Sequence, residues 1–356
     1  MKVEQDLKNF KKIFDQELER FLDAKAGEAK KISPVALAAT ANLKNYILRS
    51  GKRIRPALMY HTYLALGGKN KKEAMRAAMA PEMLHTFLII HDDVIDRDNL
   101  RRGKPSVHYF YRKSAGKKCR NFSDAIHYGN SQAICVGDMA FSFANEIIAE
   151  SKLEGSVKDG LFKKIGNIVF NTVIGEFYDG FAALEKNISE KDVLTILEYK
   201  TAKYTVEGPI HLGAIAAGAT EPVLKKLSGF AVPLGIAYQV QDDILGVFGS
   251  SEKTGKPVGA DIKEGKKTLL VVKALEFSNV RQRKEIISAL GNPRINKKQI
   301  DNVRDIISKT GSLEYSKNLA EKLTARSLQS LEKSALSRES KKFFSQVADF
   351  IIKRDY

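Results

Sequence analysis

Apolar residues recur every three or four positions through most of the chain, which is the spacing of one face of an α-helix. The stretches FKKIFDQELERFL, KDVLTILEYKTAKY and SLEYSKNLAEKLTARSLQSLEKSAL follow this spacing, and the alternation of a half-buried β-strand is scarce. Pro56 and Pro81 stand where helices would begin, at positions that suit a first helical turn. The pattern predicts an all-α protein in which helices of moderate length pack as a bundle.

No short repeat and no long low-complexity linker divides the chain, so we expect a single domain over residues 1–356. The clearest break is GNPRINKK near residue 290, after which a small C-terminal helical subdomain could begin. The hydrophobic share of 43% is enough for a large core and excludes a mainly disordered chain.

Cysteine usage and hydropathy indicate the cellular compartment in which the protein is expected. Cys119 and Cys135 are the only cysteines, which excludes a disulfide scaffold and fits a reduced environment. No apolar run approaches the roughly 18 residues of a membrane span. The charged, helix-like start carries no secretory hydrophobic region. We therefore expect a cytoplasmic protein without an integral membrane segment.

The formal net charge of +17 points to a polyanionic partner, such as nucleic acid, anionic lipid or phosphorylated small molecules. Two stretches without a strong apolar face concentrate this charge. Residues 97–120 hold nine Lys or Arg and one acid, and residues 253–267 hold five Lys, two acids and three glycines. We expect both stretches to be loops.

An acidic cluster precedes each basic stretch, namely HDDVID (residues 91–96) and QDDILG (residues 241–246). On a helix, Asp92 and Asp96 share a face one turn apart, where like charges repel unless a cation lies between them. Hard oxygen ligands in small number suit magnesium, which takes its other ligands from water and substrate phosphates. Carboxylates, metal and phosphate flanked by basic groups make a diphosphate site.

Two further features agree with this interpretation. GKRIRP (residues 51–56) gathers three cations just before a helix N-terminus, which is itself suited to anions. His85 lies seven residues before Asp92 and so shares its helical face two turns away. A packed core histidine is the alternative interpretation of His85.

The ordered motifs between about residues 35 and 280 resemble those of the trans-isoprenyl diphosphate synthases, the family of farnesyl and geranylgeranyl diphosphate synthases. They are GKRIRP, LHTFLIIHDDVIDRDNLRRGKPSVH, the pair Gly137-Asp138, GEFYD, YKTA, YQVQDDILG and GKPVGADIKEGKKT. The last two are most similar to archaeal short-chain members. The resemblance implies an antiparallel helical bundle around a deep central cavity, the isoprenoid synthase fold, and a homodimer. It also implies Mg²⁺ and two substrates, isopentenyl diphosphate and an allylic diphosphate.

The resemblance also implies a role for each matching residue. Asp92 and Asp96 would hold magnesium on the allylic diphosphate, Asp242 would hold magnesium from the opposite wall, and Arg101 would contact the same diphosphate. The residues implied to hold the diphosphate of isopentenyl diphosphate are Lys52, Arg55, His85 and Arg102.

The remaining implied roles concern the reaction itself. Thr201 and Gln239 would place neutral oxygens near the developing allylic carbocation. The double bond of isopentenyl diphosphate would attack this cation, so no protein nucleophile is needed. The cations implied to neutralise the allylic diphosphate are Lys200, Lys256 and Lys266.

The chain departs from the family pattern at three places. Gly246 ends the second acidic motif where many relatives have a third Asp, which leaves Asp243 open as a ligand. Glu176 stands where many relatives have Gln, and we assign it no role. Residues 113–127 resemble an insertion, which we expect to be a solvated loop.

The residues beneath the first aspartates bear on product length. The resemblance points to Phe87, five residues before Asp92, with Leu88 next to it. A helical wheel places Leu88 directly under Asp92 and Phe87 to its side, so geometry does not choose between them. The similarity to archaeal members implies that a single aromatic residue here favours a twenty-carbon product, geranylgeranyl diphosphate, with fifteen-carbon farnesyl diphosphate as the alternative.

Three other classes of protein fit this sequence less well. A nucleic-acid-binding protein would line one surface with basic and aromatic residues, not place its cations after acidic pairs. A class I terpene cyclase shares metal-binding aspartates but has no need for the second diphosphate site at GKRIRP. A non-catalytic subunit of a heteromeric synthase usually lacks an aspartate motif, whereas this chain keeps Asp92, Asp93 and Asp96. The sequence therefore predicts a trans-prenyltransferase.

Overall fold

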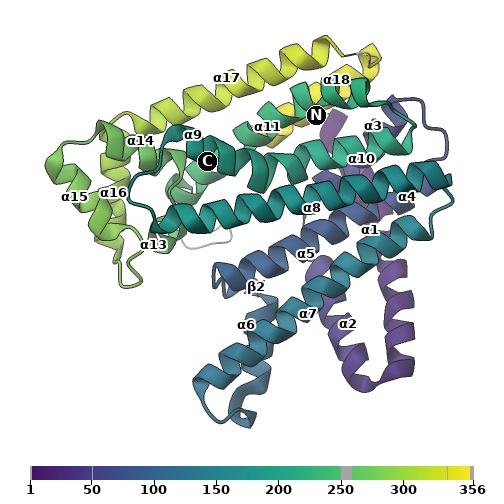
Figure 1. The fold of residues 1–356 in the computed structure, drawn as a ribbon, viewed down its shortest axis with the longest axis horizontal. Coiled ribbons are helices and arrows are strands. Elements are labelled where there is room, and N and C mark those ends of the chain that lie inside the picture. The colour runs from purple at the N-terminus through teal and green to yellow at the C-terminus, as the bar shows by residue number, and fades with distance from the viewer. Residues whose placement is uncertain (1, 50, 250–258, 335, 353–356) are drawn as a thin grey trace. The chain divides into compact units, whose positions relative to one another are not determined.

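The computed structural model describes residues 2–49, 51–249, 259–334 and 336–352. Helices make up most of these residues (Figure 1), so the predicted all-α class is confirmed. The only strands in the described ranges are β1 (Leu100–Arg101) and β2 (Lys104–Pro105), which pair antiparallel in one short hairpin. No helix in these ranges is long and apolar enough to cross a membrane.

The chain divides into two compact units. Unit 1 comprises residues 1–163 and 212–218, and unit 2 comprises residues 164–211 and 219–356. Helices α8 (Gly155–Leu184) and α10 (Gly208–Ala216) each contain residues of both units.

Unit 1 is built around α5, which packs beside α7, while α7 also packs against α6. Its core contains the side chains of Leu43, Tyr46, Ile90 and Val136. Pro56 and Pro81 lie in the first turns of α3 and α5, as predicted. The helices of unit 1 before α8 are α1 (Lys2–Ile32), α2 (Pro34–Ile47), α3 (Ile54–Ala65), α4 (Lys71–Ala77), α5 (Met79–Ile95), α6 (Val107–Ala115), the 3₁₀-helix η1 (Gly116–Lys118) and α7 (Phe122–Ala149).

Unit 2 is built around α11, which packs against η2 and α17. Residues after 290 complete its core, because Ile306 and Ala320 belong to the same apolar cluster as Val240. The Ser327 hydroxyl also donates a 2.7 Å hydrogen bond to the carbonyl of Phe230 in α11. The other elements of unit 2 are α9 (Glu190–Ile196), η2 (Leu197–Glu207), α11 (Glu221–Phe248), α13 (Ala260–Glu264), α14 (Leu269–Phe277), α15 (Val280–Ala289), α16 (Lys297–Lys309), α17 (Ser312–Glu332) and α18 (Arg338–Ile352).

The expectation that residues 97–120 form a loop was wrong. This stretch contains the β1–β2 hairpin and α6, whose ends Val107 and Ala115 are buried. The predicted 113–127 loop is also largely helical, because α7 begins at Phe122. The Asn121 side chain caps that helix by accepting a 2.9 Å hydrogen bond from the Asp124 backbone N–H. Most side chains described in this segment are nevertheless exposed, so the expectation of solvation held.

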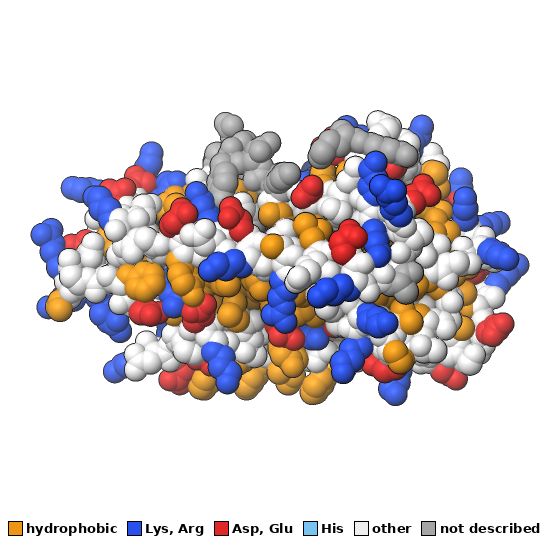
Figure 2. All heavy atoms as spheres, turned by 90° about the horizontal axis from the view of Figure 1, so that it is seen from above, with side chains coloured by type: hydrophobic (Ala, Val, Ile, Leu, Met, Phe, Trp, Pro, Cys, Tyr) orange, Lys and Arg blue, Asp and Glu red, His pale blue; other side chains and the backbone are white. Residues whose placement is uncertain are grey.

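The basic residues are dispersed on the face that Figure 2 shows. Lys and Arg side chains lie there among acidic and apolar side chains, without gathering into one continuous basic patch in the visible part of the described chain. A continuous patch is what a nucleic-acid-binding surface would require.

The three cations of GKRIRP have different surroundings. Arg53 is only 3% exposed, and its guanidinium forms ion pairs with Asp15 and Glu82. It also donates a 2.8 Å hydrogen bond to the carbonyl of Ile47. Lys52 is exposed and Arg55 is half-buried. Arg53 is therefore a structural residue that joins α1, α3 and α5.

We expect Arg53→Met to lower the free energy of unfolding by about 3–5 kcal/mol, because it leaves Glu82 as an uncompensated buried charge. Urea denaturation monitored by circular dichroism measures this change. The matched control is Lys52→Met at the exposed neighbour, which should change the value by no more than about 0.5 kcal/mol. Equal effects of the two substitutions would contradict the structural role of Arg53.

Candidate functional site

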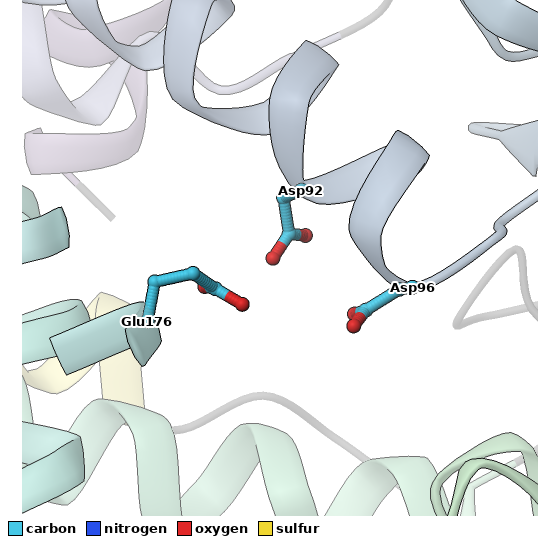
Figure 3. Close-up of side chains that lie close together, drawn as sticks. All are labelled: Asp92, Asp96 and Glu176. Carbon is cyan, nitrogen blue, oxygen red and sulfur yellow. The ribbon is translucent and has the colours of Figure 1, made fainter. Parts of the chain in front are cut away.

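The last turn of α5 carries the first acidic pair. Asp92 lies in the helix and Asp96 follows its last residue, so the two are one turn apart. Figure 3 shows both side chains extending from the same side of α5, and their carboxylate oxygens lie within 4.8 Å of one another. Both residues are half-buried. Two hard oxygen donors in this arrangement fit a divalent cation such as magnesium.

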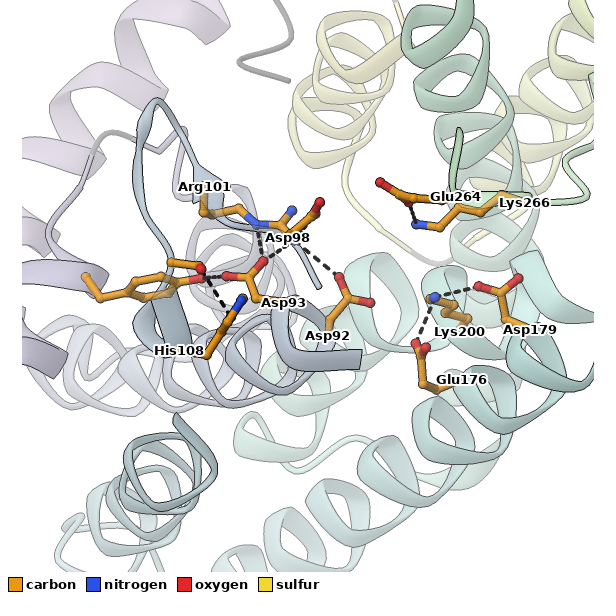
Figure 4. A network of polar contacts seen from close by, with 12 residues as sticks. Asp92, Asp93, Asp98, Arg101, His108, Glu176, Asp179, Lys200, Glu264 and Lys266 are labelled. Atoms are coloured by element: carbon orange, nitrogen blue, oxygen red, sulfur yellow. Dashed lines mark hydrogen bonds and ion pairs between the residues drawn. The ribbon is translucent and has the colours of Figure 1, made fainter. Parts of the chain in front are cut away.

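Asp93 lies between these residues but has a different role. Its carboxylate is fully buried and accepts hydrogen bonds from the Tyr46 hydroxyl at 2.8 Å and from Arg101 Nε at 2.7 Å. Burial raises the pKa of Asp93 to about 6, although Arg101 and Tyr46 both favour its charged form. Asp93 therefore holds Arg101 in place beside Asp92 (Figure 4).

The two arginines of the β1–β2 hairpin point to different partners. The Arg101 guanidinium lies 3.3 Å from Asp92 and 3.4 Å from Asp98. Arg102 has a left-handed backbone, with φ of 54°, and its exposed side chain donates a hydrogen bond to the carbonyl of Arg49. A Cβ added at Gly51 would lie 3.1 Å from the Arg102 guanidinium, so the glycine allows this close approach. The hairpin thus brings Arg102 to the start of GKRIRP.

His85 is half-buried on α5, two turns before Asp92. Burial lowers the pKa of His85 well below its usual value, and the positive charges of Arg55 and Arg102 lower it further. The imidazole is therefore neutral at pH 7, in the electrostatic field of the two arginines. Unit 1 thus brings together three of the four residues implied for isopentenyl diphosphate, and the fourth, Lys52, is exposed two residues before α3.

Close packing between α5 and α7 accounts for the Gly137-Asp138 pair. A Cβ added at Gly137 would lie 2.4 Å from the His91 ring, and the same ring lies 3.5 Å from Asp138. Phe87 stacks edge-on against His91 with ring centroids 4.8 Å apart, and its ring is 5.2 Å from that of Phe141. Leu88 is half-buried. Phe87 therefore belongs to an aromatic group shared by both helices.

Lys200 and Thr201 lie in η2, an eleven-residue π-helix. Pro209 follows shortly after; it lacks an N–H, and its ring would clash with a carbonyl in a regular α-helix. The Gly208 N–H correspondingly bonds to the carbonyl of Lys203, five residues back. Such π-helical turns are rare and often occur at functional sites.

Two glycines hold the π-helix against its neighbours in unit 2. A Cβ at Gly175 of α8 would lie 2.2 Å from the Lys200 backbone nitrogen, and a Cβ at Gly235 of α11 would lie 2.6 Å from the Ala202 Cα. Any larger residue would push these backbones apart. The Lys200 ammonium then reaches two carboxylates of α8, Asp179 at 2.6 Å and Glu176 at 2.8 Å (Figure 4).

Thr201 and Gln239 are in direct contact. The Thr201 hydroxyl donates to Gln239 Oε1 at 3.2 Å, and Gln239 Nε2 donates to Asp243 at 2.8 Å. Burial raises the pKa of Asp243 well above its usual value, and the nearby charges of Asp261 and Asp242 add to the effect. Asp242 itself is exposed. Asp243 is therefore a partner of Gln239, and Asp242 is the more accessible carboxylate.

The glycine that ends the second acidic motif also has a steric role. A Cβ at Gly246 would lie 2.4 Å from a carboxylate oxygen of Asp261, so a side chain here would displace that carboxylate. Lys266 is half-buried and pairs with Glu264 at 3.1 Å. Lys256, the third cation implied for the allylic diphosphate, lies outside the described residues.

Sequence reasoning missed several residues that position these side chains. Tyr46 and Arg53 act through buried polar contacts with α5, and no local pattern marks such contacts. Gly175 and Gly235 did carry a signal, because glycine in a helix interior often marks close backbone approach. Glu176 had no assigned role from the sequence, whereas in the structure its carboxylate lies 2.8 Å from the Lys200 ammonium.

The chain matches the family model "Polyprenyl synthetase" over residues 38–307. Geranylgeranyl diphosphate synthase of Sulfolobus acidocaldarius is 34% identical over 308 residues, which cover 85% of this chain and 87% of that protein. Geranylfarnesyl diphosphate synthase of Aeropyrum pernix is 32% identical over 313 residues, covering 86% and 92%.

Solved structures agree with these sequence relatives. Geranylgeranyl pyrophosphate synthase of Corynebacterium glutamicum, complexed with isoprenyl diphosphate and magnesium, matches with a TM-score of 0.92 at 30% identity. The match covers 98% of this chain and 99% of that chain. The chain therefore belongs to the polyprenyl synthetase family and is a trans-prenyltransferase with the all-helical isoprenoid synthase fold.

Proposed function

We propose that this chain uses magnesium to condense isopentenyl diphosphate with an allylic diphosphate, and that its main product is geranylgeranyl diphosphate. The observation that carries the proposal is the Asp92–Asp96 pair with Arg101 anchored beside it by Asp93. The twenty-carbon product is supported by the geranylgeranyl diphosphate synthases among its relatives.

The donor set fits magnesium. Asp92 and Asp96 offer carboxylate oxygens on one side of α5, and Asp242 offers an exposed carboxylate on α11. When bound, magnesium would neutralise diphosphate charge and so stabilise the diphosphate as a leaving group. Arg101 would add a guanidinium to the same diphosphate, held by Asp93 so that it need not be ordered during the reaction.

The diphosphate of isopentenyl diphosphate would bind to the cations of unit 1. Arg55 and Arg102 supply permanent charge, and the neutral His85 supplies a hydrogen bond without adding to their mutual repulsion. Lys52 would join them from the start of α3. Guanidinium groups suit this task because each can bind two phosphate oxygens at once.

Lys200, Lys256 and Lys266 would neutralise the allylic diphosphate further. Its carbon–oxygen bond breaks, and the electron pair leaves with the diphosphate. The double bond of isopentenyl diphosphate then forms the new carbon–carbon bond to the resulting cation, and the adduct loses a proton to the released diphosphate. The oxygens of Thr201 and Gln239 would stabilise the cation without trapping it covalently.

We also propose a homodimer, and exposed apolar residues on α8 support it. Their side chains are 45–86% exposed and recur at helical spacing over four turns. A continuous apolar patch of this kind is typical of a protein interface. The residues are Phe170, Val173, Ile174, Phe177, Phe181 and Leu184.

We also propose that the chain is one functional domain and that it is located in the cytoplasm. The family match runs from residue 38 to 307 and thus includes residues of both compact units, which supports one functional domain. Cys119 and Cys135 carry free thiols, which supports a reduced, cytoplasmic location.

Incubation of the purified chain with isopentenyl diphosphate and each allylic primer, followed by chain-length analysis, tests the reaction directly. We expect a mainly twenty-carbon product that needs magnesium, is lost on chelation with EDTA and returns when magnesium is restored. A mainly fifteen-carbon product would support the farnesyl alternative. No product from any primer would support the non-catalytic subunit.

Asp92→Ala should lower kcat by about 100-fold or more, because a lost metal ligand removes several kcal/mol of charge stabilisation. Steady-state kinetics at saturating magnesium measures the loss, and circular dichroism checks that the fold is kept. Asp159→Ala, at an exposed position on α8, is the matched control and should keep wild-type activity. Near-normal turnover of the Asp92 variant would refute the metal role.

Phe87→Ala should lengthen the product, since it removes the ring that packs against Phe141 and His91 beneath the aspartates. Chain-length analysis of the products measures this change. The comparison variant is Leu88→Ala, which shortens the neighbouring side chain on the same helix. An unchanged distribution for the Phe87 variant would contradict its role. A shift for the Leu88 variant alone would transfer the role to Leu88.

A further inference from the structure

Lys200 has two acidic partners that are close enough to neutralise it. Its ammonium lies 2.6 Å from Asp179 and 2.8 Å from Glu176. The exposed fraction of the side chain is 19% for Lys200, 24% for Asp179 and 21% for Glu176. Bulk water therefore screens these interactions only in part. One ammonium between two carboxylates gives these three side chains a combined charge of about −1. This charge is unfavourable for binding an anion.

The two carboxylates are not equivalent for the position of Lys200. The backbone of Lys200 is already fixed by its contact with Gly175, where no Cβ would fit. Asp179 makes the shorter contact with the ammonium, which donates a 2.6 Å hydrogen bond to its carboxylate. Glu176, one turn before Asp179 on α8, adds a second negative charge to a lysine that is already held.

We propose that Glu176 weakens the affinity of Lys200 for the allylic diphosphate and for released pyrophosphate, by competing for the same ammonium. This inference rests on the proposed function, in which Lys200 binds the allylic diphosphate. Glu176 acts through Lys200 and is therefore a positioning residue. A competing carboxylate of this kind favours release of the product pyrophosphate over its retention.

The isosteric variant Glu176→Gln separates charge from shape. Its amide oxygen can still accept a hydrogen bond from Lys200, but the competing negative charge is gone. We expect the variant to bind pyrophosphate in magnesium buffer about three- to tenfold more tightly, and to lower KM for the allylic diphosphate by the same factor. KM for isopentenyl diphosphate should not change. The gain should shrink as salt concentration rises.

Two comparison variants complete the experiment. Asp179→Asn removes the carboxylate that orients Lys200, so it should weaken pyrophosphate binding and lower kcat. Glu321→Gln, at an exposed position on α17, should behave like the wild type in both measurements. Tighter binding in the Glu176 variant together with weaker binding in the Asp179 variant would support the assignment.

Isothermal titration calorimetry measures the affinity for pyrophosphate without turnover. It therefore tests the effect of Glu176 on this affinity even if the chain does not catalyse the proposed reaction. Unchanged or weaker pyrophosphate binding by Glu176→Gln would overturn the inference. Equal tightening in the Glu176 and Asp179 variants would also overturn it, because the two carboxylates would then be interchangeable. A changed KM for isopentenyl diphosphate would show a wider disturbance of the site and would count against a role through Lys200.

Discussion

The buried carboxylate of Asp93 is the constraint on which the arrangement of unit 1 depends. A charged group without solvent must be paired, and Tyr46 and Arg101 provide the partners. Pairing with Arg101 ties the β1–β2 hairpin to the end of α5. It also leaves Asp93 outside the group formed by Asp92 and Asp96, whose carboxylate oxygens lie within 4.8 Å of one another. One buried ion pair thus fixes a guanidinium beside Asp92.

Unit 2 depends on a steric constraint instead. Gly175 and Gly235 let the backbones of α8 and α11 approach the π-helix more closely than any side chain would permit. The wider helix and this close contact together fix the backbone positions of Lys200 and Thr201. Their side chains then find partners on the same two helices, Asp179 on α8 and Gln239 on α11. Backbone packing therefore limits the placement of these polar groups.

The net charge of +17 is a poor guide to the number of cations available to a diphosphate. Arg53 belongs to GKRIRP, yet it is buried with Asp15 and Glu82 and has only a structural role. Lys200 carries its charge between two carboxylates. The basic segment 113–127 is mostly exposed and has no role in the proposed reaction. Local pairing, more than total charge, decides which cations can serve a phosphate.

The sequence by itself determined the helical class and the one-turn spacing of Asp92 and Asp96, because both depend on residues close together in the chain. It also placed the cations of GKRIRP at the start of a helix, which is α3. Only the tertiary structure decided which aspartate is buried, which arginine of GKRIRP is structural and what surrounds Lys200. These outcomes depend on pairs such as Tyr46 with Asp93, and on glycines that admit a distant backbone. Such contacts join segments far apart in sequence, and hydrophobic periodicity carries no information about them.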